Sequence, residues 1–156
     1  MIVKKITDFG RNAVSLENDQ IRTVIDALGG MMPEFSLKRG QVAINAHWIP
    51  DFRGESGKPY NPVEHANFWK EKLLYLIAGD FPCSPNFGGP CLVDGVELPA
   101  HGWVANEEWA ITDHGVSSEA SISLSPALRC RALRLACPSL GKSATWFWRI
   151  RPPITQ

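Results

Sequence analysis

The segment from Gly79 to Trp109 restricts the possible folds of this chain more than any other part of the sequence. Prolines fix the backbone φ angle and remove a hydrogen-bond donor, whereas glycines permit angles that other residues resist. This segment combines both types, with Pro82, Pro85, Pro90, Pro99, Gly88, Gly89, Gly95 and Gly102. We therefore predict a long, shaped loop. Loops of this length are uncommon inside compact domains and are often functional, although a surface connection between two sheets with no chemistry of its own is an alternative.

One histidine stands in this segment among large aromatic residues. His101 is followed closely by Trp103 and Trp109, and Asn86 and Asn106 supply side-chain amides nearby in the sequence. An imidazole can donate a hydrogen bond with one nitrogen and accept one with the other. The combination predicts a concave polar site.

The length and total charge exclude few functions. A chain of 156 residues is long enough for one domain with a hydrophobic core and too short to predict two. The formal net charge is zero, so the total charge does not indicate a nucleic-acid or membrane partner.

The charges are nevertheless unevenly distributed. Residues 1–119 hold all 16 acidic side chains and 10 basic ones, a net charge of −6, whereas residues 120–156 hold 6 basic side chains and no acidic one. A basic tail is one reason to consider a nucleic-acid binder. The tail is also rich in Arg, Ala, Cys, Pro, Ser and Trp, as expected when a GC-rich gene is translated out of frame. We therefore divide the chain into residues 1–124 and a basic tail, 125–156, and hypothesise that the coding frame changes near Ser125.

The cysteines and the hydropathy favour a cytoplasmic protein. Neither Cys83 and Cys91 nor Cys130 and Cys137 has the close spacing of a structural zinc site, so we predict free thiols and no bound metal. His47, Asp51 and His65 have no paired-ligand spacing either. The basic start lacks the apolar core of a signal peptide, and no apolar stretch is long enough to span a membrane.

Alternating apolar and polar residues predict antiparallel strands in the first fifty residues. The expected strands lie near 13–16, 21–26, 35–38 and 42–46, with turns between them. One helix is expected near 62–78, because Asn61 is suited to cap it, Pro62 fits its first position and Glu64 its capping box. After the long loop, a hairpin turn is expected at Asp113-His114-Gly115 and a returning strand near 120–124.

The run His101-Gly102-Trp103-Val104-Ala105-Asn106, with Trp109 three residues further on, resembles a known signature. It is similar to the His-Gly-Phe-Ala-Arg-Asn-x-x-Trp motif of aldose 1-epimerases, also called galactose mutarotase-like proteins. Phe81-Pro82 and Asn86-Phe87-Gly88 resemble an element that precedes this motif in the sugar-phosphate branch of the family. The resemblance extends more weakly over residues 14–124. It implies a mainly antiparallel β-sandwich, of which this chain holds the N-terminal half.

The resemblance also implies roles for four residues of the segment. His101 matches the family histidine that hydrogen-bonds the sugar, and Trp103 replaces a phenylalanine and is expected to lie against an apolar face of a pyranose. Asn86 and Asn106 are candidate partners for sugar hydroxyls. The structural alternatives are that His101 only anchors its loop, that Trp103 is a core residue, and that the asparagines form turns.

Departures from the family pattern limit the activity that is expected. Ala105 stands where the sugar-phosphate branch has a phosphate-binding arginine, and residues 73–80 contain no arginine either, which favours a neutral hexose as the small-molecule partner. The histidine and glutamate that act as acid and base in the family come from the second half of the domain. We therefore expect no catalytic pair here. Three functions stay open: an aldose 1-epimerase without its C-terminal catalytic pair, a non-catalytic carbohydrate-binding protein, or an inactive gene fragment. None of the three requires a cofactor.

Overall fold

The chain folds mainly into antiparallel β-structure in a computed structural model that describes residues 2–117, 130–136 and 145–150. Side chains are described as far as Ala110. Within this part of the chain, no helix is long and apolar enough to cross a membrane.

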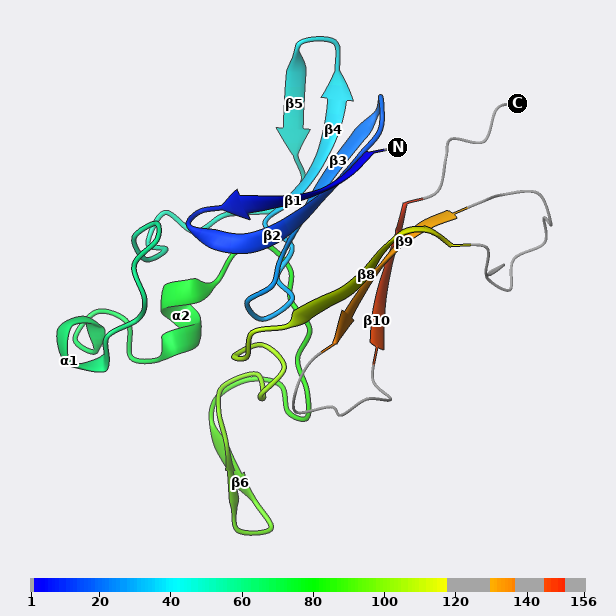
Figure 1. The fold of residues 1–156 in the computed structure, drawn as a ribbon. Coiled ribbons are helices and arrows are strands. Elements are labelled where there is room, and N and C mark those ends of the chain that lie inside the picture. The colour runs from blue at the N-terminus through cyan, green and yellow to red at the C-terminus, as the bar shows by residue number, and fades with distance from the viewer. Residues whose placement is uncertain (1, 118–129, 137–144, 151–156) are drawn as a thin grey trace.

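Five strands form the largest sheet, with spatial order identical to chain order (Figure 1). They are β1 (Ile2–Asp8), β2 (Arg11–Glu17), β3 (Ile21–Asp26), β4 (Glu34–Arg39) and β5 (Val42–Asn45). Each neighbouring pair is antiparallel. The four strands predicted from alternation are therefore confirmed. Strand β1 was not predicted. It is an edge strand with exposed Lys4 and Lys5, a feature typical of edges protected from further pairing.

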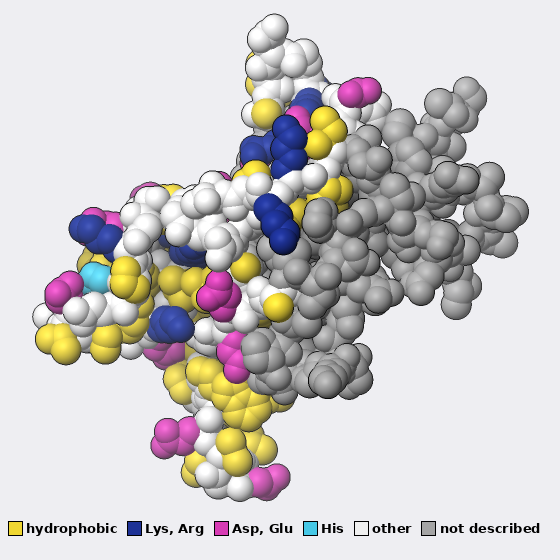
Figure 2. All heavy atoms as spheres, in the orientation of Figure 1, with side chains coloured by type: hydrophobic (Ala, Val, Ile, Leu, Met, Phe, Trp, Pro, Cys, Tyr) yellow, Lys and Arg dark blue, Asp and Glu magenta, His cyan; other side chains and the backbone are white. Residues whose placement is uncertain are grey.

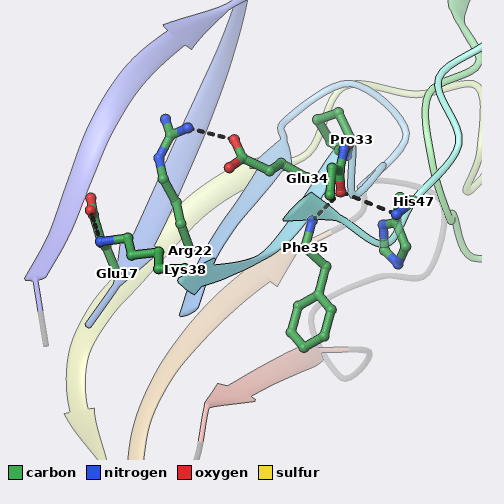
Figure 3. A network of polar contacts seen from close by, with 8 residues as sticks. Glu17, Arg22, Pro33, Glu34, Phe35, Lys38 and His47 are labelled. Carbon is green, nitrogen blue, oxygen red and sulfur yellow. Dashed lines mark hydrogen bonds and ion pairs between the residues drawn. The ribbon is translucent and has the colours of Figure 1, made fainter. Parts of the chain in front are cut away.

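The two faces of this sheet differ in polarity. On one face, Arg22 pairs with Glu34 and Lys38 with Glu17, as Figure 3 shows. Phe35 points to the opposite side of β4. Because cross-strand partners share a face, that opposite face carries an apolar set comprising Val14, Leu16, Ile25, Phe35, Leu37 and Ile44. This set is buried on β2 and β3 but exposed on β4 and β5.

Two short helices replace the single helix predicted near 62–78, so that prediction is wrong in its extent. They are α1 (Pro62–His65) and α2 (Lys72–Leu76). Asn61 caps α1 as expected, by accepting a hydrogen bond from the Val63 amide. The capping-box role predicted for Glu64 belongs instead to His65, whose Nδ1 accepts a hydrogen bond of 3.0 Å from the backbone N–H of Asn61.

The break between the helices is explained by hydrogen bonds of two aromatic side chains. The Trp69 indole donates to the Phe52 carbonyl, and the Tyr60 hydroxyl donates to the Trp69 carbonyl. In a continuous helix the Trp69 carbonyl would accept a hydrogen bond from a backbone N–H of the next turn, but here it accepts one from Tyr60. At Glu71 the backbone is extended, with φ −139° and ψ 146°. Tertiary contacts therefore override the helical pattern. Helix α2 contributes Leu73, Tyr75 and Leu76 to a buried cluster that also contains Met31, Ala78, Ala100 and Ala105.

The Gly- and Pro-rich segment is irregular except for a small hairpin formed by β6 (Cys91–Val93) and β7 (Val96–Leu98). Its turn is Asp94-Gly95, where both residues have positive φ. Exposed hydrophobic side chains gather over this hairpin in Figure 2. They include Leu92, Val93 and Val96.

A second sheet has three antiparallel strands in the order β10-β9-β8. They are β8 (Ala110–Ser117), β9 (Cys130–Ala136) and β10 (Thr145–Ile150). The hairpin turn predicted at Asp113–Gly115 is wrong: these residues lie within β8, just after a register shift that absorbs one residue. The strand predicted near 120–124 lies outside the described residues. The described parts of the basic tail are β9 and β10, and the change of coding frame stays a hypothesis.

Candidate functional site

The segment that carries His101 is tied at both ends to the connection between β3 and β4. Met32 pairs with Asp80 and Leu28 with Glu108 through isolated β-bridges. The Trp109 amide also donates to the Ala27 carbonyl at 2.7 Å. The residues between these contacts therefore form a loop that leaves the five-stranded sheet and returns to it at the same place.

Within this loop, the backbone at His101 lies against the backbone of residues 84–88. The His101 amide donates to the Gly88 carbonyl at 2.9 Å, and the Ser84 amide donates to the His101 carbonyl at 3.2 Å. His101 has φ +58°, in the left-handed region that non-glycine residues rarely adopt. Next to it, a Cβ on Gly102 would lie 2.0 Å from the Ser84 oxygen, so only glycine fits this crossing. Unfavourable backbone conformations of this kind often occur at functional sites.

The imidazole of His101 is partly exposed and contacts three side chains. Nδ1 lies 3.1 Å from the sulfur of Cys83. The rings of Phe81 and Phe87 meet the imidazole in edge-on arrangements, with centroid distances of 5.4 and 5.0 Å. Phe87 itself is 84% exposed. The ring therefore lies at the surface of the segment, outside the packed core.

Asn106 braces this segment, because its amide nitrogen donates to the Ala100 carbonyl at 2.8 Å and to the Gly102 carbonyl at 2.7 Å. These two bonds engage both of its N–H groups. Asn106 therefore lies next to His101 in the fold but cannot also donate to a sugar without releasing a carbonyl.

Asn86 is only partly used by the fold. Its amide nitrogen donates to the carbonyls of Gly89 and Pro99, both at 3.3 Å. Its buried Oδ1 has no hydrogen-bond partner among the described residues. The structure thus places Asn86 beside the His101 segment, with one acceptor unused.

The two tryptophans differ in exposure. Trp103 is partly exposed, whereas Trp109 is 2% exposed and donates from its indole to the Val104 carbonyl at 2.9 Å. Trp109 is therefore a core residue, with Gly30 packed against its ring. The proposed contact of Trp103 with a sugar stays a prediction.

A pocket of about 320 Å³ lies at a different place, beside β1 and β2. Its lining comprises Lys5, Ile6, Asn12, Ala13, Ala27, Glu108 and Trp109 and includes none of the four predicted site residues. Asn12 donates to Glu108 at 3.4 Å across this pocket. The polar residues of this pocket were not predicted, because Asn12 and Glu108 are 96 residues apart in the sequence and only Trp109 belongs to a recognisable motif.

A cluster of buried charged side chains is a second feature that was not predicted from the sequence. Asp26 is fully buried, and its Oδ2 lies 3.2 Å from Arg11 Nη1 and 3.8 Å from Arg53 Nη2. The Arg53 guanidinium stacks on the Phe9 ring at 3.7 Å. Burial raises the pKa of Asp26 to about 6, although both arginines oppose this shift. Arg11 also donates to the Leu76 carbonyl at 2.8 Å, so the cluster joins the sheet to α2.

The two histidines considered as metal ligands have separate structural roles. His47 contacts the Met32 carbonyl at 2.7 Å and Asp80 at 3.3 Å, whereas His65 stacks on Tyr75 with a centroid distance of 4.6 Å. Among the side chains described, no three His, Cys, Asp or Glu residues are grouped so that they could hold a metal ion.

Comparisons of this chain with protein-family models, curated proteins and solved structures found no match.

Proposed function

We propose that this chain is an aldose 1-epimerase-like protein that binds a neutral hexose through the His101 segment without interconverting its anomers. The proposal starts from the sequence resemblance. Its main support in the fold is the position of His101, whose imidazole is partly exposed and contacts Cys83 through Nδ1 only. Within the described residues, Nε2 has no hydrogen-bond partner and is available to a ligand.

The surroundings of the imidazole suit a carbohydrate. The edges of Phe81 and Phe87 lie against the ring and supply apolar surface of the kind that packs on the C–H groups of a pyranose. Asn86 braces the same segment, because its side-chain nitrogen donates to the carbonyls of Gly89 and Pro99 while its Oδ1 is buried. These groups are uncharged, which favours a sugar without a phosphate.

The environment of Ala105 also supports a sugar without a phosphate group. This residue is fully buried within the core cluster. The carbonyl of Ala105 lies against Gly29, where a Cβ would approach to within 2.5 Å. An arginine with the family's phosphate-binding role would need space at this position that the packed core does not provide.

In this proposal the five-stranded sheet belongs to the N-terminal half of a mutarotase-like β-sandwich. The apolar set on one face of the sheet supports it, since such a face is buried between two sheets in a sandwich. We further propose that the protein acts in the cytoplasm, where cysteines stay reduced, because Cys83 and Cys91 are free thiols.

Calorimetric titration with glucose and galactose tests the proposed binding. The wild-type chain should bind at least one of these sugars, and His101→Ala should weaken binding at least tenfold. Phe68→Ala is a matched control, because this exposed ring lies in a different segment. Polarimetry should show no acceleration of mutarotation by either form. Failure of the wild-type chain to bind either sugar would contradict the proposal, and accelerated mutarotation would contradict the loss of catalysis.

A further inference from the structure

We propose that Cys83 is a positioning residue that holds His101 in the tautomer with its proton on Nε2, so that the imidazole presents a hydrogen-bond donor to its ligand. The inference deepens the proposed function and rests on it for the identity of the ligand. The role of Cys83 itself is a property of the free protein.

The first support is the distance between the two side chains. The Cys83 sulfur lies 3.1 Å from Nδ1 of His101, well within hydrogen-bond range for sulfur. Two arrangements are compatible with this contact: the thiol donates to Nδ1, or Nδ1–H donates to the sulfur. A thiol is a weak donor and a weak acceptor, so the strength of the partners alone does not select between them. We infer the first arrangement because Nδ1 is the acceptor nearest to the thiol, and this arrangement places the imidazole proton on Nε2.

The protonation state of the cysteine agrees with this direction. Burial raises the pKa of the Cys83 thiol above its ordinary value, so the sulfur keeps its proton at neutral pH. The Phe81 carbonyl, a competing acceptor, lies 4.0 Å from the sulfur. The shorter contact is the one to His101, and the thiol proton is expected to point there.

The orientation of the ring is fixed by its backbone and its neighbours. His101 is held at positive φ by hydrogen bonds on both sides of its peptide, to Gly88 and to Ser84. Phe81 and Phe87 contact the imidazole edge-on. A flip of the ring about its Cβ–Cγ bond would place Cδ2 where Nδ1 lies and would break the hydrogen bond with Cys83. With Nδ1 directed at the sulfur, Nε2 lies on the far side of the ring, where no described residue binds it.

This arrangement sets which ligand atoms the histidine can recognise. An Nε2–H group donates and does not accept, so it selects a lone pair on a sugar oxygen. The opposite tautomer would require a hydroxyl proton instead. In most sites that fix a histidine tautomer, the partner of the other nitrogen is a backbone carbonyl or a carboxylate, both of which accept a hydrogen bond from a ring N–H. A thiol partner reverses this assignment.

Nitrogen-detected NMR of the histidine-labelled protein tests the tautomer without any ligand. The His101 signals are assigned by their loss in His101→Gln. The wild-type chain should show Nε2 protonated and Nδ1 unprotonated at neutral pH. Cys83→Ser keeps an O–H donor and should preserve this pattern, whereas Cys83→Ala should give a mixture of both tautomers. A wild-type ring with its proton on Nδ1, or an unchanged pattern in Cys83→Ala, would overturn the inference.

A chemical variant covers the case in which Cys83→Ala does not fold. In a chain with Cys91, Cys130 and Cys137 replaced by serine, a methanethiosulfonate reagent converts the Cys83 thiol into a methyl disulfide and releases methanesulfinate. The thiol proton is replaced by an S-methyl group that cannot donate, and the modified chain should show the same mixture of tautomers. Sugar titrations then separate the two proposals. Cys83→Ala should weaken hexose binding several-fold and Cys83→Ser should not. If the NMR result holds but no hexose binds, the proposed function fails and the role of Cys83 stands.

Discussion

Arg11 and Asp26 form an ion pair of 3.2 Å between the first residue of β2 and the last residue of β3. Asp26 is fully buried and pairs across the strands with Ala13, so its carboxylate lies on the same face as Arg11. Its Oδ1 has no hydrogen-bond partner among the described residues, and neither do Nε and Nη2 of Arg53. Removing such groups from water costs free energy that an incomplete set of hydrogen bonds does not restore. The charge cluster therefore makes stability sensitive to the protonation of Asp26.

The first prediction concerns the pH dependence of unfolding. The pKa of Asp26 is raised by burial to about 6 in the folded chain, above the ordinary value of 3.8. The folded state consequently binds a proton more tightly than the unfolded state, and the contribution of this carboxyl to stability increases as the pH falls through 6. Between pH 7 and pH 5 the gain should be about 1 kcal/mol. Urea unfolding at the two pH values measures it.

Asp26→Asn provides the comparison for this effect, since the amide cannot titrate. Glu17 does not contribute to a change between pH 7 and pH 5, because the hydrogen bond with Lys38 lowers the pKa of the Glu17 carboxyl. Stability from Glu17 is lost only as the pH falls through a value below 4.5. If the variant and the wild-type chain change equally between pH 7 and pH 5, Asp26 does not cause the dependence.

A second prediction concerns the crossing of the chain at Gly102. Gly102→Ala should lower the free energy of unfolding by about 3 kcal/mol, because the methyl group would meet the Ser84 oxygen and the residue has φ +77°. Gly40→Ala is a matched control: its φ is +61°, but a Cβ there meets nothing within 4 Å. The control should lose only about 1 kcal/mol, the cost of the left-handed conformation. Equal losses in urea unfolding would show that the crossing is not tightly packed.

The third prediction separates bracing by Asn106 from ligand binding. Asn106→Asp has the same shape but replaces the amide donor with a carboxylate oxygen that faces two carbonyls. It should destabilise the chain by about 2 kcal/mol in urea unfolding, since two buried acceptors lose their donor and face a negative charge. Asn67→Asp makes the same chemical change at an exposed position in the turn after α1 and should have an effect within about 0.5 kcal/mol. Equal stability of the two variants would assign Asn106 no structural role.

The sequence predicted the parts of the fold whose signals are local. The alternation at Ile21–Asp26 and the cap at Asn61 both depend on neighbouring residues, and both are confirmed. The hairpin turn at Asp94-Gly95 could also have been predicted, because an Asp-Gly pair between two short apolar runs is typical of a hairpin. It was missed because the surrounding prolines and glycines led us to expect an irregular loop throughout.

The candidate site depends on contacts that local patterns do not encode. Cys83 and His101 are 18 residues apart, and the bracing of Asn106 depends on how the chain turns at Gly102. The interruption between α1 and α2 has the same origin, since Trp69 is held by Phe52 from a preceding loop. Local patterns therefore identified the segment and its residues but not their partners. They also gave no sign of the buried charges around Asp26.

The last prediction concerns β5, with which the five-stranded sheet ends among the described strands. The edge strand β5 contains no charged residue, and Val42 and Ile44 are 59% and 54% exposed. Ile44 pairs with Leu37 across the strands, so the apolar set of this face continues to an unprotected edge. Uncharged edges of this kind promote association between chains. Ile44→Lys should therefore slow aggregation, measured by light scattering during mild heating, with little change in the free energy of unfolding. Val63→Lys adds the same charge at an exposed position in α1 and should leave the rate unchanged. An equal effect of both variants would mean that net charge, and not the β5 edge, controls aggregation.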